Sequence, residues 1–345
     1  MKNEVSSYKK DLYVSKRPSG MPAWLVPLLV FVLIVVIVFW VAPAIVERLQ
    51  AGRLEDQEPA VTTIPTKYDE TTRVVSKPVA DVFDRPDLKA KRVTQVLLNE
   101  PVYVQNQRCP SGYVAVRLQD GVTGYMMTSD LISDCSSIEP AAYPYKAIVI
   151  SAQKRVMSHA KRGTLLAEVM MGTELYIDYR GTGVSRVVLP GGEKGWISDD
   201  GVVILPSTEK IKPPYQPRQA FCSTALSFLQ ATVLENGQTV RGISTVGIVH
   251  LSASINGLEV PRTLDGLLQT GQLVPLSYDE STGLLDLSNL LPGDLLFLSD
   301  PNNPERAADV AIYADIGQII YAKPSQTSIR LMNLNENEDI LKRIL

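Results

Sequence analysis

GISTVGIVHLS, residues 242–252, is the stretch that decides how the C-terminal part of this chain folds. It follows QAFCSTALSFLQATVL at 219–234, where apolar residues recur at helical spacing, so the two stretches predict consecutive helices. The segments LLPGDLLFL at 290–298 and ADVAIYADIGQIIYA at 308–322 have the apolar runs and turn residues of β-strands. Together they predict an α+β domain over 219–345, with the helices first and the sheet after them.

The middle of the chain has a different pattern, with short alternating strands broken by Asn, Asp, Gly and Pro. Such a pattern is typical of small β-barrels. It occurs twice, and in each half a late strand contains a glycine followed by an aromatic residue, at Gly124 and at Gly195. We therefore predict a duplication that gives two barrels, at 72–138 and 144–205. A proline-rich linker at 206–218 connects them to the last domain.

A long apolar segment lies near the N-terminus, because no residue between Pro18 and Val46 is charged. A helix of this length crosses a hydrocarbon core of about 30 Å. Basic residues predominate before the segment, which predicts a cytoplasmic tail at 1–20, a single transmembrane helix at 21–46 and a linker at 47–71, with the rest of the chain extracytoplasmic. The alternative is a cleaved signal peptide, although the run exceeds the roughly 7–15 residues of a signal core.

Composition excludes several classes of function. The chain has 345 residues and a net charge of -3, which gives no electrostatic reason to expect nucleic acid as a partner. Its three cysteines and two histidines are too scattered to form a recognisable zinc site. No glycine-rich phosphate loop follows a predicted strand. We therefore expect neither a metal nor a cofactor.

Cys109 and Cys135 are candidates for a disulfide, because they bracket the last strands of the first predicted barrel. Outside the cytoplasm two such thiols can oxidise. Closing a loop of about 26 residues would stabilise the fold by roughly 3–4 kcal/mol. Two free thiols are the alternative interpretation, since the sequence does not give the distance between the two residues.

The order and spacing of the C-terminal segments, together with VPRT at 260–263, resemble the NlpC-type papain-like cell-wall cysteine peptidases. The likeness is greatest to members with two bacterial SH3 domains, which act as γ-D-glutamyl-L-diamino acid endopeptidases. It covers residues 72–345 and implies that both predicted barrels are bacterial SH3-like domains. It also implies an NlpC-type peptidase domain over 219–345.

The resemblance places the family's catalytic positions on residues of other types. In the family the nucleophile motif reads Asp-Cys-Ser-Gly, whereas Ser244 and Thr245 occupy its first two positions here. The family's histidine opens a strand of the form His-Val-Gly-Ile-Tyr, and Asp309 stands in its place. The third, orienting polar residue corresponds to Tyr321. Of the Tyr-x-Trp-Gly-Gly element that shapes the family's pocket, only Gly237 is present.

These substitutions predict an inactive site, in which no catalytic residue is expected. The Thr245 hydroxyl is far less acidic than a thiol, and an internal threonine has no terminal amine to activate it. Asp309 is a weaker base than imidazole near neutral pH. Ser244, a candidate substrate-binding residue, lacks the carboxylate that grips the substrate's amine in the family. Losing a nucleophile alone costs on the order of 10⁶ in kcat.

Two other residues could supply a nucleophile or an acid. Cys222-Ser223 superficially matches the family's Cys-Ser, but it lies much farther from Pro261 than the family's nucleophile does, so Cys222 is interpreted as a helix-face residue. Asp294 is interpreted as a turn carboxylate in its Pro-Gly-Asp sequence. The two histidines, His159 and His250, are expected to be structural.

The sequence therefore predicts a membrane-anchored, extracytoplasmic pseudopeptidase of a bacterial cell envelope. Its expected partner is a cell-wall peptide or an envelope protein, in addition to the membrane that its helix spans. One alternative is an active γ-D-glutamyl-diamino acid endopeptidase with an atypical site. Another is a structural docking subunit of an envelope assembly. The extracytoplasmic space is either a periplasm or the external wall space.

Overall fold

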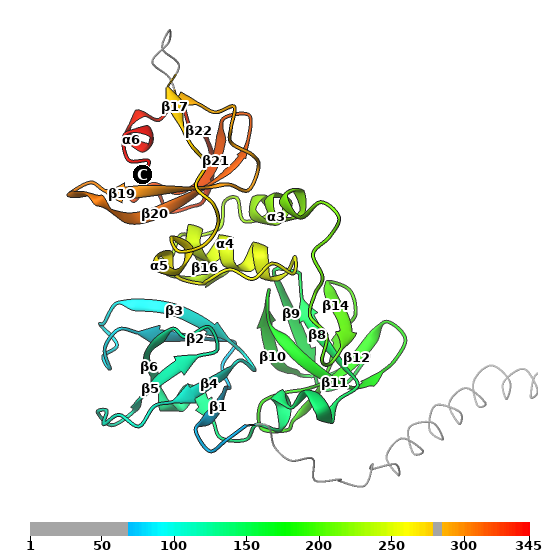
Figure 1. The fold of residues 1–345 in the computed structure, drawn as a ribbon. Helices are drawn as coiled ribbons and strands as arrows, with labels where there is room; N and C mark the ends of the chain where they lie inside the picture. The colour runs from blue at the N-terminus through cyan, green and yellow to red at the C-terminus, as the bar shows by residue number, and fades with distance from the viewer. Residues whose placement is uncertain (1–67, 279–284) are drawn as a thin grey trace, which may run out of the picture. The chain divides into compact units, whose positions relative to one another are not determined.

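The computed structural model describes residues 68–278 and 285–345, which lie in one compact unit (Figure 1). The predicted cytoplasmic tail, the transmembrane helix at 21–46 and most of the linker at 47–71 lie outside the described residues. Within the two described ranges, the helices are all too short or too polar to cross a membrane.

The first seven strands form one antiparallel sheet with the order β3-β2-β6-β5-β4-β1-β7. The strands are β1 (Thr72–Val75), β2 (Val79–Phe83), β3 (Arg92–Leu97), β4 (Pro101–Val104), β5 (Tyr113–Leu118), β6 (Thr123–Met127) and β7 (Leu131–Ile132), with a 3-10 helix η2 (Thr128–Asp130) before β7. Alternating side chains such as Val82, Val96 and Val116 bury a separate hydrophobic cluster.

The next seven strands form a second sheet with the order β10-β9-β13-β12-β11-β8-β14. They are β8 (Tyr145–Val149), β9 (Gln153–Met157), β10 (Leu165–Met170), β11 (Glu174–Arg180), β12 (Val184–Val188), β13 (Lys194–Ser198) and β14 (Val202–Pro206), preceded by 3-10 helices η3 (Ser136–Ile138) and η4 (Pro140–Ala142). Adding seven to each strand number of the first sheet gives this order. The repeat seen in the sequence thus has a counterpart in the topology.

The glycine that precedes an aromatic residue in each half has the same role in both sheets. A Cβ on Gly124 would meet Val82 Cγ1 at 2.5 Å and the Phe83 carbonyl at 2.7 Å. A Cβ on Gly195 would collide with Val156 Cγ1 in the second sheet. Each glycine therefore lets one strand pass close to another, from β6 to β2 and from β13 to β9.

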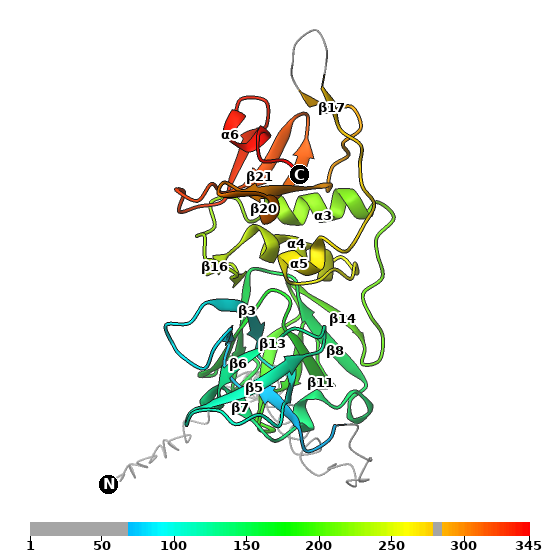
Figure 2. The same ribbon diagram turned by 60° about the vertical axis from the view of Figure 1, so that its left-hand side comes forward.

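The C-terminal region places its helices before its sheet, as predicted. Its elements are α3 (Pro217–Leu226), β15 (Gln238–Thr239), β16 (Gly242–Ile243), α4 (Thr245–Ser254), α5 (Leu264–Leu267), β17 (Ser277–Tyr278), β18 (Leu285–Asp286), β19 (Leu295–Asp300), β20 (Asn303–Asp315), β21 (Gln318–Tyr321), β22 (Arg330–Asn333) and α6 (Glu338–Leu341). Strands β19 to β22 form an antiparallel sheet in sequence order. In Figure 1 and Figure 2, α3 and α4 lie between this sheet and the two preceding sheets.

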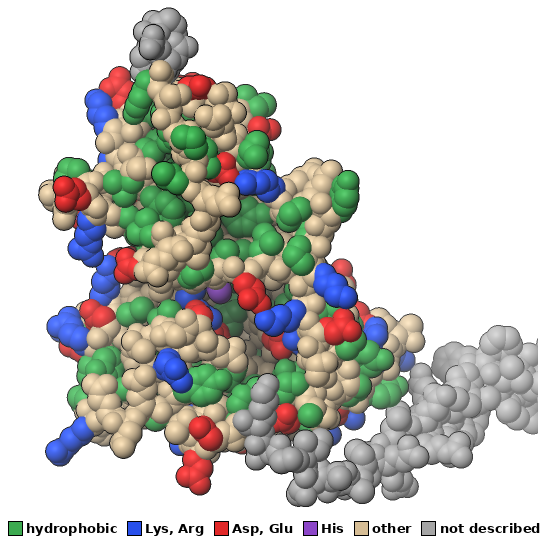
Figure 3. All heavy atoms as spheres, viewed as in Figure 1, with side chains coloured by type: hydrophobic (Ala, Val, Ile, Leu, Met, Phe, Trp, Pro, Cys, Tyr) green, Lys and Arg blue, Asp and Glu red, His purple; other side chains and the backbone are tan. Residues whose placement is uncertain are grey.

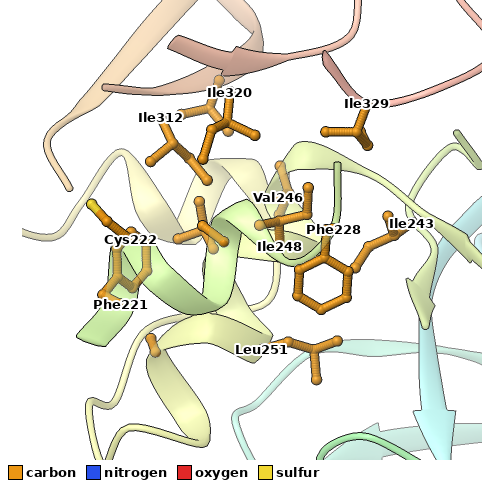
Figure 4. Packing of buried hydrophobic residues seen from close by; sticks show 14 of the residues in the cluster. Phe221, Cys222, Phe228, Ile243, Val246, Ile248, Leu251, Ile312, Ile320 and Ile329 are labelled. Atoms are coloured by element: carbon orange, nitrogen blue, oxygen red, sulfur yellow. The ribbon is translucent and has the colours of Figure 1, made fainter. Parts of the chain in front are cut away.

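The two faces of the C-terminal sheet bury different clusters. Val310, Ile312 and Ile320 pack against the apolar residues of α3 and α4, as Figure 4 shows for the two isoleucines. Ala311 and Tyr313 alternate with them and pack on the opposite face, with residues of β18 and α6. Fully burying one such aliphatic side chain contributes roughly 1.5–3 kcal/mol to the free energy of unfolding. The apolar contacts between α4 and this face of the sheet therefore do much to hold α4 in place.

Cys109 and Cys135, the candidates for a disulfide, are both free cysteines in this structure, which corresponds to the alternative interpretation. Each thiol contacts a different backbone carbonyl. Cys109 Sγ lies 3.5 Å from the Gln107 oxygen in its own loop, and Cys135 Sγ lies 3.9 Å from the Thr72 oxygen at the start of β1. The two cysteines are therefore held by separate local contacts.

Candidate functional site

Thr245 is the first residue of α4, and its side chain is 4% exposed. The preceding residue, Ser244, is the N-cap: its hydroxyl accepts a hydrogen bond from the Gly247 N–H at 3.1 Å. The same hydroxyl donates to the Gly237 carbonyl at 3.4 Å. A thiol at the start of a helix is acidified by the helix dipole, but a threonine hydroxyl starts from a much higher pKa.

The start of α4 is pressed against the loop that ends in Gly237. A Cβ on Gly247 would collide with the Gly237 carbonyl oxygen, and a Cβ on Gly237 would collide with the Gly242 carbonyl. The Ser244 N–H also donates to the Gly237 carbonyl at 3.1 Å. Close backbone packing, together with the Ser244 cap, thus sets where position 245 lies.

Asp309 and Tyr321 lie together on the other face of the C-terminal sheet. Asp309 pairs with Leu298, whose side chain belongs to the cluster that also buries Tyr321. Burial raises the pKa of the Asp309 carboxyl, and a 2.9 Å hydrogen bond from the Val310 N–H opposes that rise. Burial and the nearby Asp309 both raise the pKa of Tyr321. The buried Tyr321 hydroxyl has no hydrogen-bond partner among the described residues.

The structure therefore brings together two of the three family-equivalent positions but leaves the third apart. Thr245 belongs to a helix whose apolar residues pack on the Val310 and Ile312 face, whereas Asp309 is on the face of Leu298. Among the hydrogen bonds of the described residues, none joins Thr245 to Asp309 or to Tyr321. The described part of the chain places no base beside the Thr245 hydroxyl.

The other candidate nucleophile, Cys222, is packed in the core. It lies in the cluster beside Phe221 (Figure 4), and burial raises the pKa of its thiol to about 11. No hydrogen bond among the described residues connects it to His250, whose Nδ1 instead lies 3.0 Å from the Val260 carbonyl. Asp294 is a turn carboxylate, as expected, since it accepts from the Leu291 N–H at 2.8 Å.

A groove of about 440 Å³ runs beside β16, just before the start of α4. We call it the β16 groove; the first sheet contributes Asp81, Phe83 and Leu88 to its walls, and the C-terminal region contributes Leu234, Thr239 and Arg241. Its walls thus carry apolar surface together with charges of both signs. Sequence reasoning did not find this groove, because its two walls come from segments about 150 residues apart in the chain.

A second feature that sequence reasoning missed is a buried ion cluster centred on Arg262. The guanidinium lies 2.8 Å from Glu100 and 2.6 Å from Asp120, and its side chain is 11% exposed. Both carboxylates belong to the first sheet region, so the cluster ties that sheet to the C-terminal domain. Burial, followed by the positive charge of Arg262, lowers the pKa of nearby His250. The only sequence signal was the VPRT segment itself.

No group of three or more His, Cys, Asp or Glu residues that could hold a metal occurs in 68–278 or 285–345.

Comparison with known proteins relates the chain to cell-wall peptidases. No family model matches it. It is 22% identical over 251 residues to a γ-D-glutamyl-L-lysine dipeptidyl-peptidase of Bacillus cereus, a match that covers 71% of each chain. The chain is thus similar to this peptidase over most of the length of both proteins.

Solved structures show that this chain has the NlpC/P60 papain-like fold. An NlpC/P60 family protein from Bacillus cereus superposes with a TM-score of 0.66 at 18% identity, covering 79% of this chain and 97% of the other. An NlpC/P60 endopeptidase from Photobacterium damselae subsp. piscicida gives a TM-score of 0.54 at 10% identity, covering 78% and 67%. The family resemblance predicted from the C-terminal segments is confirmed.

Proposed function

We propose that this chain is a membrane-anchored, extracytoplasmic pseudopeptidase that binds cell-wall peptide without cleaving it. The observation that carries the proposal is the start of α4. There the buried Thr245 occupies the position that the family resemblance equates with the nucleophile, and no base among the described residues forms a hydrogen bond with its hydroxyl.

The chemistry of position 245 supports the absence of turnover. A cysteine nucleophile acts as a thiolate, which a neighbouring imidazolium stabilises. A threonine hydroxyl needs a base to remove its proton during attack, and Asp309 is positioned on the opposite sheet face. Losing a nucleophile costs on the order of 10⁶ in kcat in a serine-protease precedent.

The β16 groove supports a binding role. Its volume of about 440 Å³ falls within the roughly 300–1,000 Å³ of small-ligand pockets. Its lining includes two cationic side chains, Lys77 and Arg241, and two carboxylates, Asp81 and Asp130, which suits a short peptide that has both an amine and a carboxylate. The relative from Bacillus cereus acts on γ-D-glutamyl-L-lysine linkages, so we propose the same class of wall peptide as the ligand.

The remaining parts of the chain would position this site. The repeated sheets support the interpretation of 72–138 and 144–205 as bacterial SH3-like domains, because the two have the same strand order. The apolar run at 21–46 supports a single membrane anchor with a cytoplasmic N-terminus. Fold and chemistry are separable, so a scaffold without turnover can still recognise its ligand.

The test is to incubate the full chain with muropeptides that contain γ-D-glutamyl-L-lysine and to measure binding and amine release in parallel. Saturable binding with no released amine is expected. Release of free amines at the rate of a working peptidase would contradict the proposal and favour the active endopeptidase. If neither is seen, the structural docking subunit is favoured.

A double variant, Thr245→Cys with Asp309→His, restores both family residue types and provides a check on geometry. Because Asp309 is on the face opposite α4, we expect the variant to bind as the natural chain does and to release no amine. Activity in this variant would mean that the two positions approach one another more closely than the strand pairing indicates.

A further inference from the structure

Four partly exposed side chains form a row across the outer face of the second sheet, which we call the Arg186 row. Met157 on β9 pairs with Trp196 on β13. Arg186 on β12 pairs with Trp196 on one side and with Tyr179 on β11 on the other. Arg186 and Trp196 each lie between buried neighbours on their strands, so the row points outward. Figure 3 shows basic and acidic side chains beside hydrophobic ones over the β11–β12 end of this sheet, at the lower right.

The guanidinium of Arg186 is held in place by two rings and a carboxylate. Its Cζ lies 5.8 Å from the ring centroid of Tyr179 and 5.9 Å from that of Trp196. The two rings meet edge to face, with their centroids 5.8 Å apart. Arg186 Nε donates to Asp178 Oδ1 at 2.9 Å. Stacking and the Nε hydrogen bond together fix the plane and the direction of the guanidinium.

The outer end of this guanidinium has donors to spare. A guanidinium has five N–H groups, and the bond to Asp178 uses the one on Nε. Over the described ranges, Nη1 and Nη2 of Arg186 form no hydrogen bond with the protein, and the side chain is 35% exposed. Two parallel N–H groups at the end of a guanidinium match the two oxygens of a carboxylate. Arg186 is therefore prealigned for a second carboxylate, supplied by a ligand.

The charges at the row favour a monoanion. Asp178 is shared between two cations, because its Oδ2 lies 3.1 Å from Lys194 Nζ while its Oδ1 accepts from Arg186. These three groups leave one positive charge in excess, and the Lys194 side chain is 55% exposed. One carboxylate neutralises this excess, whereas a dianionic phosphate reverses its sign.

Arg180, at the end of β11, shows what the surroundings of Arg186 add. Its Cζ lies 5.4 Å from the ring centroid of Tyr145. It stacks on that ring alone, is exposed, and has no ion pair with any described carboxylate. Ordering such a side chain on a ligand costs rotational freedom that Arg186 has already lost in the fold.

From this arrangement we propose that the Arg186 row binds the free carboxylate end of a peptide whose last side chain is aliphatic. Nη1 and Nη2 of Arg186 donate to the two carboxylate oxygens. The aliphatic side chain packs on the exposed surface of Trp196 and Met157. The walls of the β16 groove contain none of these residues, so the inference does not depend on the proposed function.

The test titrates N-acetyl-L-leucine into the full chain and follows tryptophan fluorescence. Trp196 is the one tryptophan outside the apolar run at 21–46, so a change in emission reports this face. A saturable change is expected. N-acetyl-L-leucinamide, which keeps the side chain but lacks the carboxylate, should give none, and N-acetylglycine should bind more weakly because it lacks the aliphatic group. An equal response to the amide, or methyl phosphate binding as tightly as N-acetyl-L-leucine, would overturn the proposal.

The variant Arg186→Lys keeps the positive charge and removes the paired N–H groups. It should weaken binding of N-acetyl-L-leucine about tenfold, as expected for the loss of a charge-assisted hydrogen bond. Arg180→Lys makes the same exchange on the single-ring stack and should leave binding unchanged. Unchanged binding in Arg186→Lys would also overturn the proposal. If Arg186→Lys does not fold, the ligand series on the natural chain decides, because the amide and the acid differ only in the group that Arg186 recognises.

Discussion

Arg262→Met should destabilise the fold strongly, because it leaves two carboxylates without their shared cation. The guanidinium is 2.8 Å from Glu100 and 2.6 Å from Asp120, and the three side chains are 11%, 17% and 27% exposed. Removing one partner from a buried ion pair costs about 3–5 kcal/mol. Since Asp120 keeps some contact with water, we take the lower end, about 3 kcal/mol, which lowers Tm by about 6–12 °C.

The assay is thermal and urea unfolding of the full chain, followed by circular dichroism. Lys210→Met is the matched control, because Lys210 pairs with Glu259 on the surface, where both side chains are at least 80% exposed. It should leave Tm unchanged, since exposed pairs contribute little. A triple variant that adds Glu100→Gln and Asp120→Asn to Arg262→Met should recover part of the loss. Equal Tm values for Arg262→Met and Lys210→Met would refute the reasoning.

Two further predictions concern buried titratable groups. Burial raises the pKa of Asp309, so the fold favours the protonated carboxyl over the ionised one. The stability that the protonated carboxyl contributes is lost as pH rises through the folded pKa. Asp309→Asn should therefore be at least as stable as the natural chain at pH 7, and its advantage should shrink as pH falls toward about 4; an advantage that grows with acid would contradict this sign. The Cys222 thiol, buried and with its pKa raised to about 11, should resist iodoacetamide at pH 8 under native conditions while Cys109 reacts, as peptide mass mapping would show; rapid labelling of Cys222 would mean that it is accessible.

Local patterns predicted most of the C-terminal fold. The apolar residues at 310–314 are consecutive, as in a strand buried on both faces, and the structure buries Val310 and Ile312 on one side and Ala311 and Tyr313 on the other. The structure begins α4 at Thr245, with Ser244, a favoured residue type at that position, as its N-cap. Helix α5, which the sequence analysis did not single out, is short and covers only Leu264–Leu267 after the Thr263 cap.

The candidate sites were harder to predict, because they depend on contacts between distant segments. Arg262 meets Glu100 and Asp120 only after the first sheet docks on the C-terminal domain, and no local pattern specifies that docking. Strand alternation predicts that Asp309 and Ala311 share one face of the sheet. It does not predict which of the two faces α4 packs against. Cysteine spacing suggested a bond between Cys109 and Cys135, yet the spacing carries no information on distance.

The backbone contact between Gly247 and Gly237 has a consequence for what position 245 tolerates. The helix start is located by main-chain packing and by the Ser244 cap, so its geometry does not depend on which small side chain follows Ser244. Alanine, serine, cysteine or threonine at 245 should leave the neighbouring loop undisturbed. In such an arrangement a reactive group can be exchanged for an inert one while the recognition surface around it persists.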